Sequence, residues 1–532
     1  MDCRIERRLS EFFTGETAAK AGLLSRQGGI DPLVSSLEYD SRKAGPGTMY
    51  FALSGLHTDG HRFIGEAVAK GAAVIVHQEE PGEKKPGVVY LRTEDSRYAM
   101  SPVAAAFYGF PSQRLLVAGV TGTEGKSTTT YLIWQLLSLM GKKAGLISTV
   151  QFSDGGEERW NPEHQTTPEA VTVQRMLREM ADNGCVYAAV EASSHGLSPK
   201  TNRLGDVLFD AAAFTNVNHE HLEFHGSWEQ YRSDKANLFR ALGHGQAKTI
   251  AGISAPPRPF GVVNIDDKSA DYFTEAAKCK TFSYSVMGRD ADLTMNAIKS
   301  SAWGNWYNVY IVAERLRIDI RDRLPGGFNA GNVLAALLVV SALTGVPAKS
   351  IIPLCPRLHP VRGRMNAVDR GQPFETLVDY AHTPSSFRAI FPPLRKRLDE
   401  SGGRIISVFG SAGERDIQKR PDQGKIAAAY SDIIVLADED PRGERPMDIL
   451  EEIAAGVHAG ETASFRRDEN LFLIPDRPAA IRRALSLARP GDLVLLLGKG
   501  HENTIIYRDH AVPFDEITET EKALSEMGYK NE

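Results

Sequence analysis

The stretch VAGVTGTEGKSTTTYLIWQLLSLMGKK, residues 117–143, joins an apolar strand, a glycine-rich loop and a helical pattern. In such a loop the glycines let backbone N–H groups approach phosphate, Lys126 can reach the outer phosphates, and the Ser127 hydroxyl can hold Mg2+. After the loop, apolar side chains recur at helical spacing: Leu132, Ile133, Leu136, Leu137 and Met140. The stretch therefore predicts a nucleotide phosphate loop between a strand and a helix, rather than a plain glycine-rich turn.

The loop departs from the usual spelling of such motifs. The strict form, G-x-x-x-x-G-K-[ST], would need a glycine at Val120, whereas Gly119 and Gly122 lie on either side of that position. The sequence of the loop thus indicates nucleotide binding but does not indicate the kind of enzyme.

Apolar runs that alternate with helical patterns extend this reading to the rest of the chain. Buried strands are expected over residues 144–150, 185–193, 209–217 and 259–266, and again over 404–410, 432–440 and 492–500. Shorter runs at 48–53 and 72–78 indicate a small α/β domain at the start. We therefore predict an α/β protein of mostly parallel sheets, with ligands at the carboxyl ends of the strands.

Composition narrows the classes of function. The 532 residues are 42% hydrophobic and 24% charged, as in ordinary globular proteins, and the net charge is −5. We expect no nucleic-acid partner, because there is no overall positive charge to attract one. Four widely separated cysteines indicate neither a disulfide framework nor a zinc site. No apolar run approaches the ~18 residues of a membrane span, so we expect no membrane insertion and a cytoplasmic protein.

A cluster of possible metal ligands follows two of the predicted strands. It comprises Glu191, His219, Glu220, His221, Glu223 and His225. A zinc-protease motif is excluded, because H-E-x-x-H would need a histidine where Glu223 stands. Glutamate and histidine beside a phosphate loop suit Mg2+ when phosphate and water oxygens complete the coordination. The alternative is a set of surface polar residues that cap a helix.

Lys235 raises a separate question. An ammonium close to Mg2+ would be repelled and penalised by burial, so its neutral form would be favoured there. A neutral amine can react with CO2, and the resulting carbamate would resemble a carboxylate ligand. From the residues alone, a plain surface lysine is the better interpretation.

Motifs spread over nearly the whole chain resemble those of the Mur ligases, and within them the MurE type, the UDP-N-acetylmuramoyl-tripeptide synthetases. They are GVTGTEGKSTTT (119–130), HQTTPEA (164–170), EASSHGL (191–197), TNVNHEHLEFHGS (215–227), KANLF (235–239), GGFNAGNVLAA (326–336), VRGRMNAV (361–368), VDYAHTP (378–384), FGSAGERDIQKRP (409–421), DEDPRGERP (438–446) and GKGHE (498–502). This family spells its phosphate loop TGTxGK[ST], which accounts for the departure at Val120.

The resemblance implies an ATP-dependent amide ligase of peptidoglycan precursor synthesis with three domains. A uridine-binding domain is expected over 1–112, a central ATP-binding domain over 113–360 and a Rossmann-like amino-acid-binding domain over 361–532. Such an enzyme adds a diamino acid to the D-Glu of UDP-N-acetylmuramoyl-L-Ala-D-Glu through an acyl phosphate, with ATP and two Mg2+ ions. Other cell-wall synthesis enzymes are possible partners.

The resemblance also assigns site residues. The family's catalytic positions match Lys126, Glu191, His221 and Lys235. Its metal positions match Ser127, Glu191, His221 and Lys235, the last as a CO2-derived carbamate. The resemblance thus reverses the interpretation of Lys235 as a plain surface lysine. ATP contacts are expected at Gly122, Thr123, Glu124, Gly125, Lys126, Ser127, Thr128, Asn329, Asn332, Arg364 and Asp379. Contacts to the UDP-muramoyl peptide are expected at Ser41, His57, Thr166, Thr167, Ser193 and Arg203. For several of these residues, capping or packing is the alternative.

The amino-acid site departs from the family pattern. Enzymes of this type that add meso-diaminopimelate have DNPR where this chain has Glu439, Asp440, Pro441 and Arg442. An arginine can hold a carboxylate, whereas Asp440 would favour a cation, so we expect L-lysine or L-ornithine more than meso-diaminopimelate. The predicted pocket comprises Arg415, Asp440, Arg442, Gly498 and Glu502. Glu124 also replaces a loop asparagine, for which the sequence offers no physical account.

Two alternatives remain. One is another ligase of the Mur superfamily, against which the first region and HQTTP argue. The other is a catalytically silent nucleotide-binding scaffold for cell-wall enzymes. A scaffold would not need Lys126, Glu191, His221 and Lys235 together, so we favour the ligase.

Overall fold

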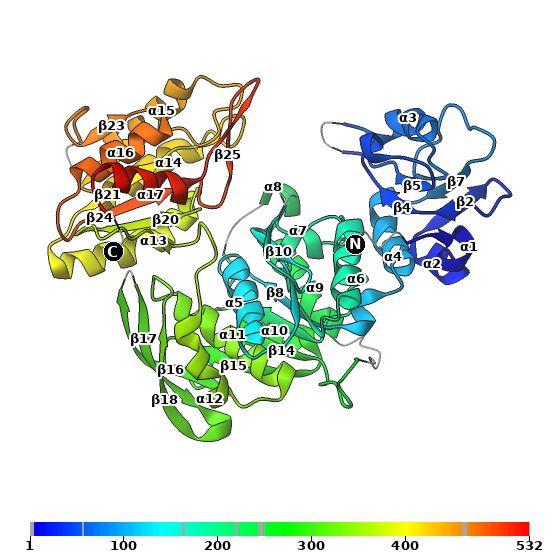
Figure 1. Cartoon of the computed structure of the whole chain (residues 1–532), viewed down its shortest axis with the longest axis horizontal. Helices are drawn as coiled ribbons and strands as arrows, with labels where there is room; N and C mark the ends of the chain where they lie inside the picture. The colour runs from blue at the N-terminus through cyan, green and yellow to red at the C-terminus, as the bar shows by residue number, and fades with distance from the viewer. Residues whose placement is uncertain are drawn as a thin grey trace. The chain divides into compact units, whose positions relative to one another are not determined.

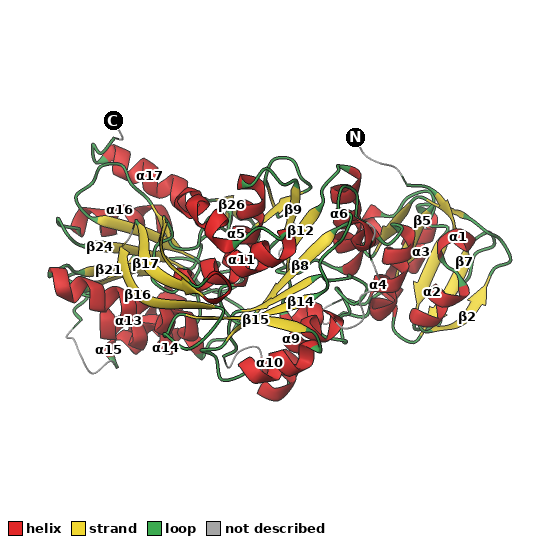
Figure 2. Cartoon of the chain, turned by 90° about the horizontal axis from the view of Figure 1, so that it is seen from below, coloured by secondary structure: helices red, strands yellow, loops and turns green. Residues whose placement is uncertain are grey.

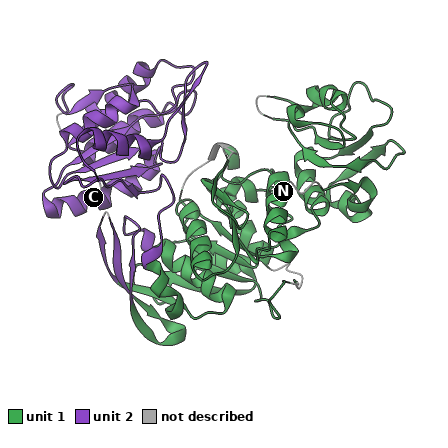
Figure 3. Ribbon diagram, in the orientation of Figure 1, with its two compact units in different colours: residues 1–296, 309–318, 331–355 green, residues 297–308, 319–330, 356–532 purple. Residues whose placement is uncertain are grey.

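The computed structural model describes residues 5–55, 58–161, 165–218, 222–242, 248, 250–301, 303–459 and 465–530. The chain divides into two compact units (Figure 3). Unit 1 comprises residues 1–296, 309–318 and 331–355, and unit 2 comprises 297–308, 319–330 and 356–532.

Unit 1 begins with a five-stranded sheet in the order β2-β7-β6-β5-β4. The strands are β2 (Leu23–Gln27), β4 (Ser36–Glu38), β5 (Thr48–Phe51), β6 (Val74–His77) and β7 (Val89–Thr93), and only β2 pairs antiparallel. The helices are α1 (Leu9–Phe12), α2 (Gly15–Lys20), α3 (Ile64–Ala69) and α4 (Ser96–Phe107), and a short pair, β1 (Arg7–Arg8) with β3 (Leu33–Val34), lies apart from the sheet. Apolar side chains of the strands and of α4 form one buried cluster.

The second sheet has eleven strands in the order β11-β10-β9-β12-β8-β13-β14-β15-β16-β17-β18. Its centre is parallel and consists of β9 (Ala144–Ile147), β12 (Tyr187–Glu191), β8 (Leu116–Thr121), β13 (Ala211–Phe214), β14 (Phe260–Asn264) and β15 (Lys280–Ser285). The outer strands are β10 (Gln151–Ser153), β11 (Arg159–Trp160), β16 (Leu293–Ser301), β17 (Gly304–Ile311) and β18 (Leu316–Asp322).

Helices cover both faces of this sheet, as Figure 2 shows for α5 (Lys126–Leu139) and α11 (Asn329–Thr344) on one side and α9 (Trp228–Ala241) and α10 (Ala270–Ala277) on the other. The remaining helices of this part are α6 (Ala170–Asp182), α7 (Ser194–Leu197), α8 (Leu222–His225) and α12 (Ala348–Ile351). The central strands are buried almost throughout, which explains their continuous apolar runs in the sequence.

Unit 2 contains a six-stranded sheet in the order β19-β20-β24-β21-β22-β23, at the yellow-to-red end of the chain in Figure 1. The strands are β19 (Asn366–Ala367), β20 (Glu375–Asp379), β24 (Leu493–Leu497), β21 (Ile405–Phe409), β22 (Ile433–Leu436) and β23 (Leu471–Leu473), and all but β19 are parallel. The helices are α13 (Pro384–Ser401), α14 (Lys419–Tyr430), α15 (Pro446–His458), α16 (Arg477–Leu487) and α17 (Glu516–Glu526), and a separate hairpin pairs β25 (Thr504–Ile506) with β26 (Ala511–Pro513).

The predicted α/β class with mostly parallel sheets is confirmed, and each buried strand expected from the sequence lies within the expected stretch. The sequence analysis did not predict β16, β17 and β18. Within the described ranges, no single helix is long and apolar enough to cross a membrane. The helical segments Asn329–Thr344 and Ala348–Arg357 are together long and apolar enough for a membrane span, but the chain bends by 111° between them. Most of α11 is also buried in the protein core.

Candidate functional site

The phosphate loop follows β8 and is held by residues that follow the neighbouring strand β13. The backbone N–H of Thr123 donates to the carbonyl of Asn216 at 2.8 Å, and that of Glu124 donates to Asn216 Oδ1 at 2.9 Å. The Glu124 carbonyl accepts from Thr215 Oγ1 at 2.6 Å. The backbone around Glu124 is thus fixed by hydrogen bonds that do not depend on the identity of its side chain.

Two glycines in this loop leave no room for a side chain. Gly122 has φ +156°, and a Cβ there would overlap Thr215 Oγ1. Gly125 has φ +80°, and its Cβ would lie 2.5 Å from Asn332 Oδ1. Asn332 on α11 also accepts a 3.1 Å hydrogen bond from Thr129 of α5. Asn332 therefore lies beside the phosphate loop, and its ATP contact stays a prediction, while Asn329 donates to the carbonyl of Pro325 at 2.7 Å.

Glu191 connects the phosphate loop to a neighbouring strand end. It is the last residue of β12 and is fully buried. Its Oε1 accepts from Ser127 Oγ at 2.8 Å, and its Oε2 accepts from the backbone N–H and the hydroxyl of Thr149 at 2.8 and 2.9 Å. A buried carboxylate thus lies against the serine that opens α5, which brings together two of the four predicted metal ligands.

Lys235 is buried, with 1% of its surface exposed, so it is not the surface lysine that the residues alone favoured. Its Nζ donates to the carbonyl of Gly122 at 2.5 Å and lies 4.3 Å from the centre of the Tyr231 ring. Lys126 Nζ donates to the carbonyl of Thr123 at 2.7 Å. Both lysines therefore contact the phosphate loop itself.

The donor set fits Mg2+, which binds carboxylate, hydroxyl and phosphate oxygens. Ser127 and Glu191 place oxygen atoms side by side at the start of α5. His221, the third predicted ligand, lies outside the described residues, as do His219 and Glu220. His225 is described and belongs to a different arrangement: its Nδ1 lies 2.7 Å from Asp234 Oδ2.

Residues expected to contact the muramoyl peptide gather beyond β12. Thr167 Oγ1 donates to the Glu191 carbonyl at 3.0 Å and accepts from the backbone N–H of Ser193, also at 3.0 Å. Arg203 donates to the carbonyl of Thr167 at 2.7 Å and to Glu169 Oε1 at 2.9 Å. Thr166 is partly buried beside them in the chain. This group therefore lies next to the predicted metal ligand Glu191.

Among the helices and loops that adjoin the first sheet, Ser41 Oγ donates to Glu66 Oε2 at 3.2 Å, and Asp40 forms an ion pair with Arg42. Hydrogen bonds from Arg42 to Asp40 hold the pKa of that carboxyl below its usual value. His57 lies outside the described residues.

In unit 2, Asp379 ends β20 and its two oxygens accept backbone N–H bonds from Met365 at 2.8 Å and from Ala381 at 2.7 Å. Burial raises the pKa of this carboxyl. The Arg364 guanidinium lies 4.8 Å from the centre of the Tyr380 ring, and its Nε has no hydrogen-bond partner among the described residues. The backbone preceding β19 thus places Arg364 near Asp379.

Two of the predicted amino-acid residues, Asp440 and Glu502, contact a buried lysine that was not expected from the sequence. Lys499 Nζ lies 2.9 Å from Asp440 Oδ1 and 2.5 Å from Glu502 Oε2, and Lys499 is fully buried. Asp440 Oδ1 also accepts from the backbone N–H of Ile506 at 2.9 Å. The cation that Asp440 binds here is therefore supplied by the chain itself, which differs from the expectation that its charge would be available to a substrate.

Other members of this group have special backbone conformations. Arg442 has φ +54°, and its Nε has no hydrogen-bond partner in the part of the chain that the structure describes. Gly498 has φ +105°, and a Cβ there would lie 3.1 Å from Glu439 Oε2. This buried oxygen of Glu439 also has no hydrogen-bond partner among the described residues. Arg415 is exposed. Buried polar atoms without partners are uncommon in folded proteins, and a bound ligand or water is one way in which they are satisfied.

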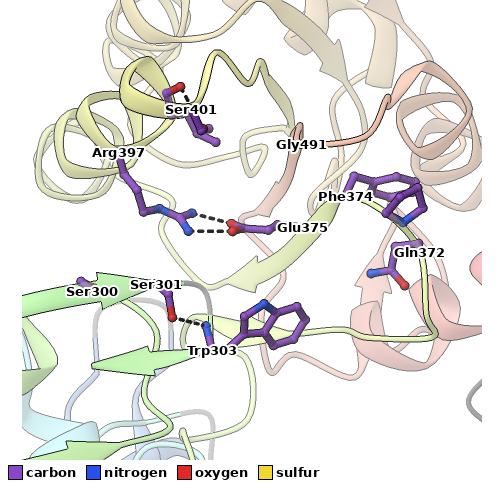
Figure 4. A pocket seen from close by; sticks show the side chains of 11 residues that line it. Ser300, Ser301, Trp303, Gln372, Phe374, Glu375, Arg397, Ser401 and Gly491 are labelled. Carbon is purple, nitrogen blue, oxygen red and sulfur yellow. Dashed lines mark hydrogen bonds and ion pairs between the residues drawn. The ribbon is translucent and has the colours of Figure 1, made fainter. Parts of the chain in front are cut away.

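A cavity of about 570 Å3 in unit 2 contains none of the predicted site residues (Figure 4). Its lining includes Trp303, Phe374 and an ion pair between Arg397 and Glu375, with Nη1–Oε1 and Nη2–Oε2 distances of 2.7 and 2.5 Å. The cavity is therefore distinct from the nucleotide and amino-acid residues.

Sequence reasoning missed Thr149, Thr215 and Lys499. Lys499 could have been found, because it lies within GKGHE, the same motif that supplied Gly498 and Glu502. Thr149 and Thr215 follow β9 and β13, and only the strand order shows that they flank the phosphate loop.

The fold and the site define a phosphate-loop nucleotide enzyme with a buried glutamate and lysine at the loop. Three family models match the chain: "Mur ligase family, catalytic domain" over residues 33–108, "Mur ligase middle domain" over 120–340, and "Mur ligase, glutamate ligase domain" over 363–500. The chain belongs to the Mur ligase family.

Relatives and a solved structure are similar along nearly the whole length. A UDP-N-acetylmuramyl-tripeptide synthetase of Treponema denticola is 49% identical over 511 residues, covering 92% of this chain and 94% of that protein. A UDP-N-acetylmuramoyl-L-alanyl-D-glutamate--2,6-diaminopimelate ligase of Geobacillus kaustophilus is 37% identical over 503 residues, covering 94% and 96%. A solved structure named as that type of ligase has a TM-score of 0.62 at 26% identity and covers 93% of this chain and 96% of its own.

The resemblance drawn from the motifs is therefore confirmed, as are the three-domain Mur ligase fold and the class of ATP-dependent acid–amino-acid ligase in peptidoglycan precursor synthesis. ATP and Mg2+ are the general requirements of this class. The domain boundaries, the site assignments and the particular substrates stay predictions.

Proposed function

We propose that this ligase joins a diamino acid to the D-Glu carboxylate of UDP-N-acetylmuramoyl-L-Ala-D-Glu, with cleavage of ATP to ADP and phosphate. The contact between Ser127 and Glu191 carries the proposal, because a buried carboxylate beside the serine of the phosphate loop is suited to hold the Mg2+ that neutralises a nucleotide's phosphates. The printed names of the relatives, which include a tripeptide synthetase and a diaminopimelate ligase, support the choice of acceptor and donor.

The reaction has two steps. The carboxylate attacks the γ-phosphorus to give an acyl phosphate and ADP, and the amine of the incoming amino acid then displaces phosphate to form the amide. Because phosphoryl transfer needs positioning and charge neutralisation, Lys126 and the amides of the Gly122–Thr128 loop would act on the transferred group. Bound Mg2+ supplies positive charge that stabilises the phosphate oxygens, and Ser127, Glu191 and His221 would hold it.

We assign the fourth metal position to a carbamate on Lys235. The uncharged amine adds to CO2 to give the N-carboxylate and releases one proton. Burial supports this modification, because it penalises an ammonium, and the hydrogen bond from Nζ to the Gly122 carbonyl is compatible with it. The carbamate nitrogen keeps one N–H, which can still donate to that carbonyl, and its two oxygens become available to metal.

The identity of the amino acid depends on the charge balance around Lys499. This lysine already neutralises Asp440, so the argument that Asp440 selects a substrate ammonium is weaker than the sequence indicated. Arg442 has an Nε that is buried without a partner among the described residues and could hold a carboxylate. We therefore keep L-lysine, L-ornithine and meso-diaminopimelate as candidate donors, with Arg415, Asp440, Arg442, Gly498 and Glu502 as contacts.

The remaining assignments follow from position. We place the UDP-muramoyl peptide against Ser41, His57, Thr166, Thr167, Ser193 and Arg203, and the nucleotide against Asn329, Asn332, Arg364 and Asp379 in addition to the loop. We propose the three domains at 1–112, 113–360 and 361–532. A cytoplasmic location would supply ATP and keep the cysteines reduced. We also propose other cell-wall synthesis enzymes as partners.

The test is phosphate release with UDP-N-acetylmuramoyl-L-Ala-D-Glu, ATP and Mg2+, with the three diamino acids supplied in turn. Turnover with one of them would establish the reaction and the donor. Lys235→Ala should abolish most turnover while the protein still binds ATP. Full turnover in that variant would refute the metal assignment. If the folded protein releases no phosphate with any of the three donors, the result would favour the nucleotide-binding scaffold or a different acceptor.

A further inference from the structure

A buried chain of hydrogen bonds lies beside the proposed metal site. Asp234 Oδ2 lies 2.7 Å from His225 Nδ1, and His225 Nε2 lies 3.1 Å from Ser194 Oγ. The three residues are between 1% and 4% exposed. Burial lowers the pKa of His225 despite the Asp234 carboxylate, which favours the neutral imidazole. In that state Nδ1–H donates to Asp234, and Nε2 accepts from the Ser194 hydroxyl.

The three residues come from three different segments, each of which carries one proposed metal ligand. Ser194 opens α7, three positions after Glu191 at the end of β12. His225 ends α8, four positions after His221. Asp234 lies on α9 next to Lys235. The hydrogen-bonded chain therefore ties together the backbone segments that would have to converge on Mg2+.

A serine, histidine and aspartate in this order resemble a nucleophilic triad, but the geometry argues against that role. A nucleophile needs access to its substrate, whereas Ser194 is 3% exposed. Aromatic rings pack around the imidazole: Phe224, Tyr231 and His195 have centroids 4.7, 5.1 and 5.2 Å from that of His225. The enclosure is typical of a structural hydrogen bond rather than of a reacting group.

One of the side chains packed around His225 also contacts Lys235. Tyr231 contacts the His225 ring on one side, and Lys235 Nζ lies 4.3 Å from the centre of the Tyr231 ring. Tyr231 OH also lies 3.1 Å from Thr123 Oγ1 of the phosphate loop. A displacement of His225 would therefore be transmitted to both the lysine and the loop.

We propose that Ser194, His225 and Asp234 are positioning residues that hold the α7, α8 and α9 segments together so that the metal ligands converge. This inference rests on the proposed function only for the identity of those ligands. It assigns to the three residues no contact with substrate or metal. Their role is to fix the distances between groups that do make such contacts.

The test compares His225→Phe with the wild-type protein. Phenylalanine keeps the ring packing but removes both hydrogen bonds. We expect the Mg2+ concentration for half-maximal phosphate release to rise at least 10-fold. We also expect Mg2+ binding in the presence of a non-hydrolysable ATP analogue, measured by calorimetry, to weaken by a similar factor, while the affinity for the analogue without Mg2+ changes less than twofold.

His77→Phe is a matched control, because His77 is also a buried histidine, 1% exposed, whose Nδ1 lies 2.9 Å from the Glu79 carbonyl in the first sheet. It should lower thermal stability without changing Mg2+ binding. If His225→Phe fails to fold, Ser194→Ala removes only one hydroxyl and should still weaken Mg2+ binding about threefold, as expected for one hydrogen bond of roughly 0.7 kcal/mol.

Unchanged Mg2+ binding in a folded His225→Phe or Ser194→Ala protein would overturn the inference. A loss of stability with no change in Mg2+ binding would also overturn it, since that result indicates a purely structural role. Calorimetry does not require turnover, so failure of the proposed ligase reaction in the wild-type protein would be recognised separately. In that case the Mg2+ measurements would still test the positioning role.

Discussion

Ser127 donates a 2.8 Å hydrogen bond to Glu191 across 64 positions of the chain. The contact exists because β8 and β12 are parallel neighbours, so their carboxyl ends meet at the same edge of the sheet. It places a buried carboxylate at the start of the helix that follows the phosphate loop. The first prediction concerns this carboxylate.

Glu191→Gln should lower phosphate release at least about 100-fold, the typical effect of losing one group that stabilises transition-state charge. The neutral amide is a weaker metal ligand, and it has one acceptor oxygen where the carboxylate uses two, one for Ser127 and one for Thr149. Steady-state phosphate release at saturating Mg2+ measures the effect. Thr149→Ser keeps the hydroxyl and serves as the control. Turnover of Glu191→Gln within threefold of the wild-type value would contradict the assignment.

Gly122→Ala should weaken ATP binding at least about 10-fold, because the new Cβ would overlap Thr215 Oγ1 and displace the loop. Gly141→Ala is the matched control. Gly141 also has a positive φ, +71°, but a Cβ there meets no atom of the described residues within 4 Å. It should cost about 1 kcal/mol of stability from backbone strain and leave ATP affinity unchanged. Equal ATP dissociation constants for the two variants, measured by calorimetry, would show that the loop tolerates the overlap.

The sequence was sufficient for those parts of the fold and site that depend on local pattern. The strand before the loop, the helix after it and the position of Glu191 at a strand end all follow from apolar periodicity and the rule that parallel sheets bind ligands at carboxyl ends. Lys235 could be placed only by resemblance, because a lysine on an amphipathic helix is normally exposed.

Contacts between distant segments could not be predicted in the same way. Lys499 and Asp440 are 59 positions apart, and they meet because β24 and β22 both flank β21 and carry them past their carboxyl ends. From the sequence alone, Asp440 has no visible partner inside the chain, so its charge was expected to be available to a substrate. The pairing of His225 with Asp234 likewise depends on the turn between α8 and α9, for which the residues offered no distinctive signal.

Asp438→Asn should stabilise unit 2 at neutral pH. Burial raises the pKa of Asp438 from its ordinary value of 3.8 to about 6, so the fold favours the protonated carboxyl. The resulting penalty is absent below pH 3.8, grows between there and pH 6, and is complete above pH 6. Asparagine mimics the neutral form and can still accept from Tyr507, so the gain above pH 6 should reach about 2–3 kcal/mol.

Urea unfolding of Asp438→Asn and the wild-type protein at pH 4, 5, 6 and 7.5 measures this gain. The difference in unfolding free energy should be small at pH 4 and largest at pH 7.5. Asp509→Asn is the control, because Asp509 is exposed and paired only with its neighbour His510 in the interactions given by the structure. A gain that is independent of pH would show that the effect does not arise from the Asp438 carboxyl.

Asp440→Asn should change the choice of amino acid without unfolding the protein. Its amide oxygen can still accept from the Ile506 N–H, and Lys499 keeps Glu502 as a partner, so the site gains one unit of positive charge while its hydrogen bonds persist. We expect the ratio of kcat/KM for meso-diaminopimelate to that for L-lysine to rise about 10-fold, equivalent to roughly 1.4 kcal/mol, because a second carboxylate is then favoured over an ammonium.

Lys499→Met tests the same charge balance from the opposite direction. Removing the buried ammonium leaves Asp440 and Glu502 without their cation, which should cost about 3–5 kcal/mol of stability and shift the ratio toward L-lysine, whose ammonium could replace the lost charge. Opposite shifts of the ratio in the two variants would show that Lys499 and Asp440 together set the preference. If neither variant changes the ratio, selection must lie elsewhere in the pocket, and Arg442 would be the next residue to substitute.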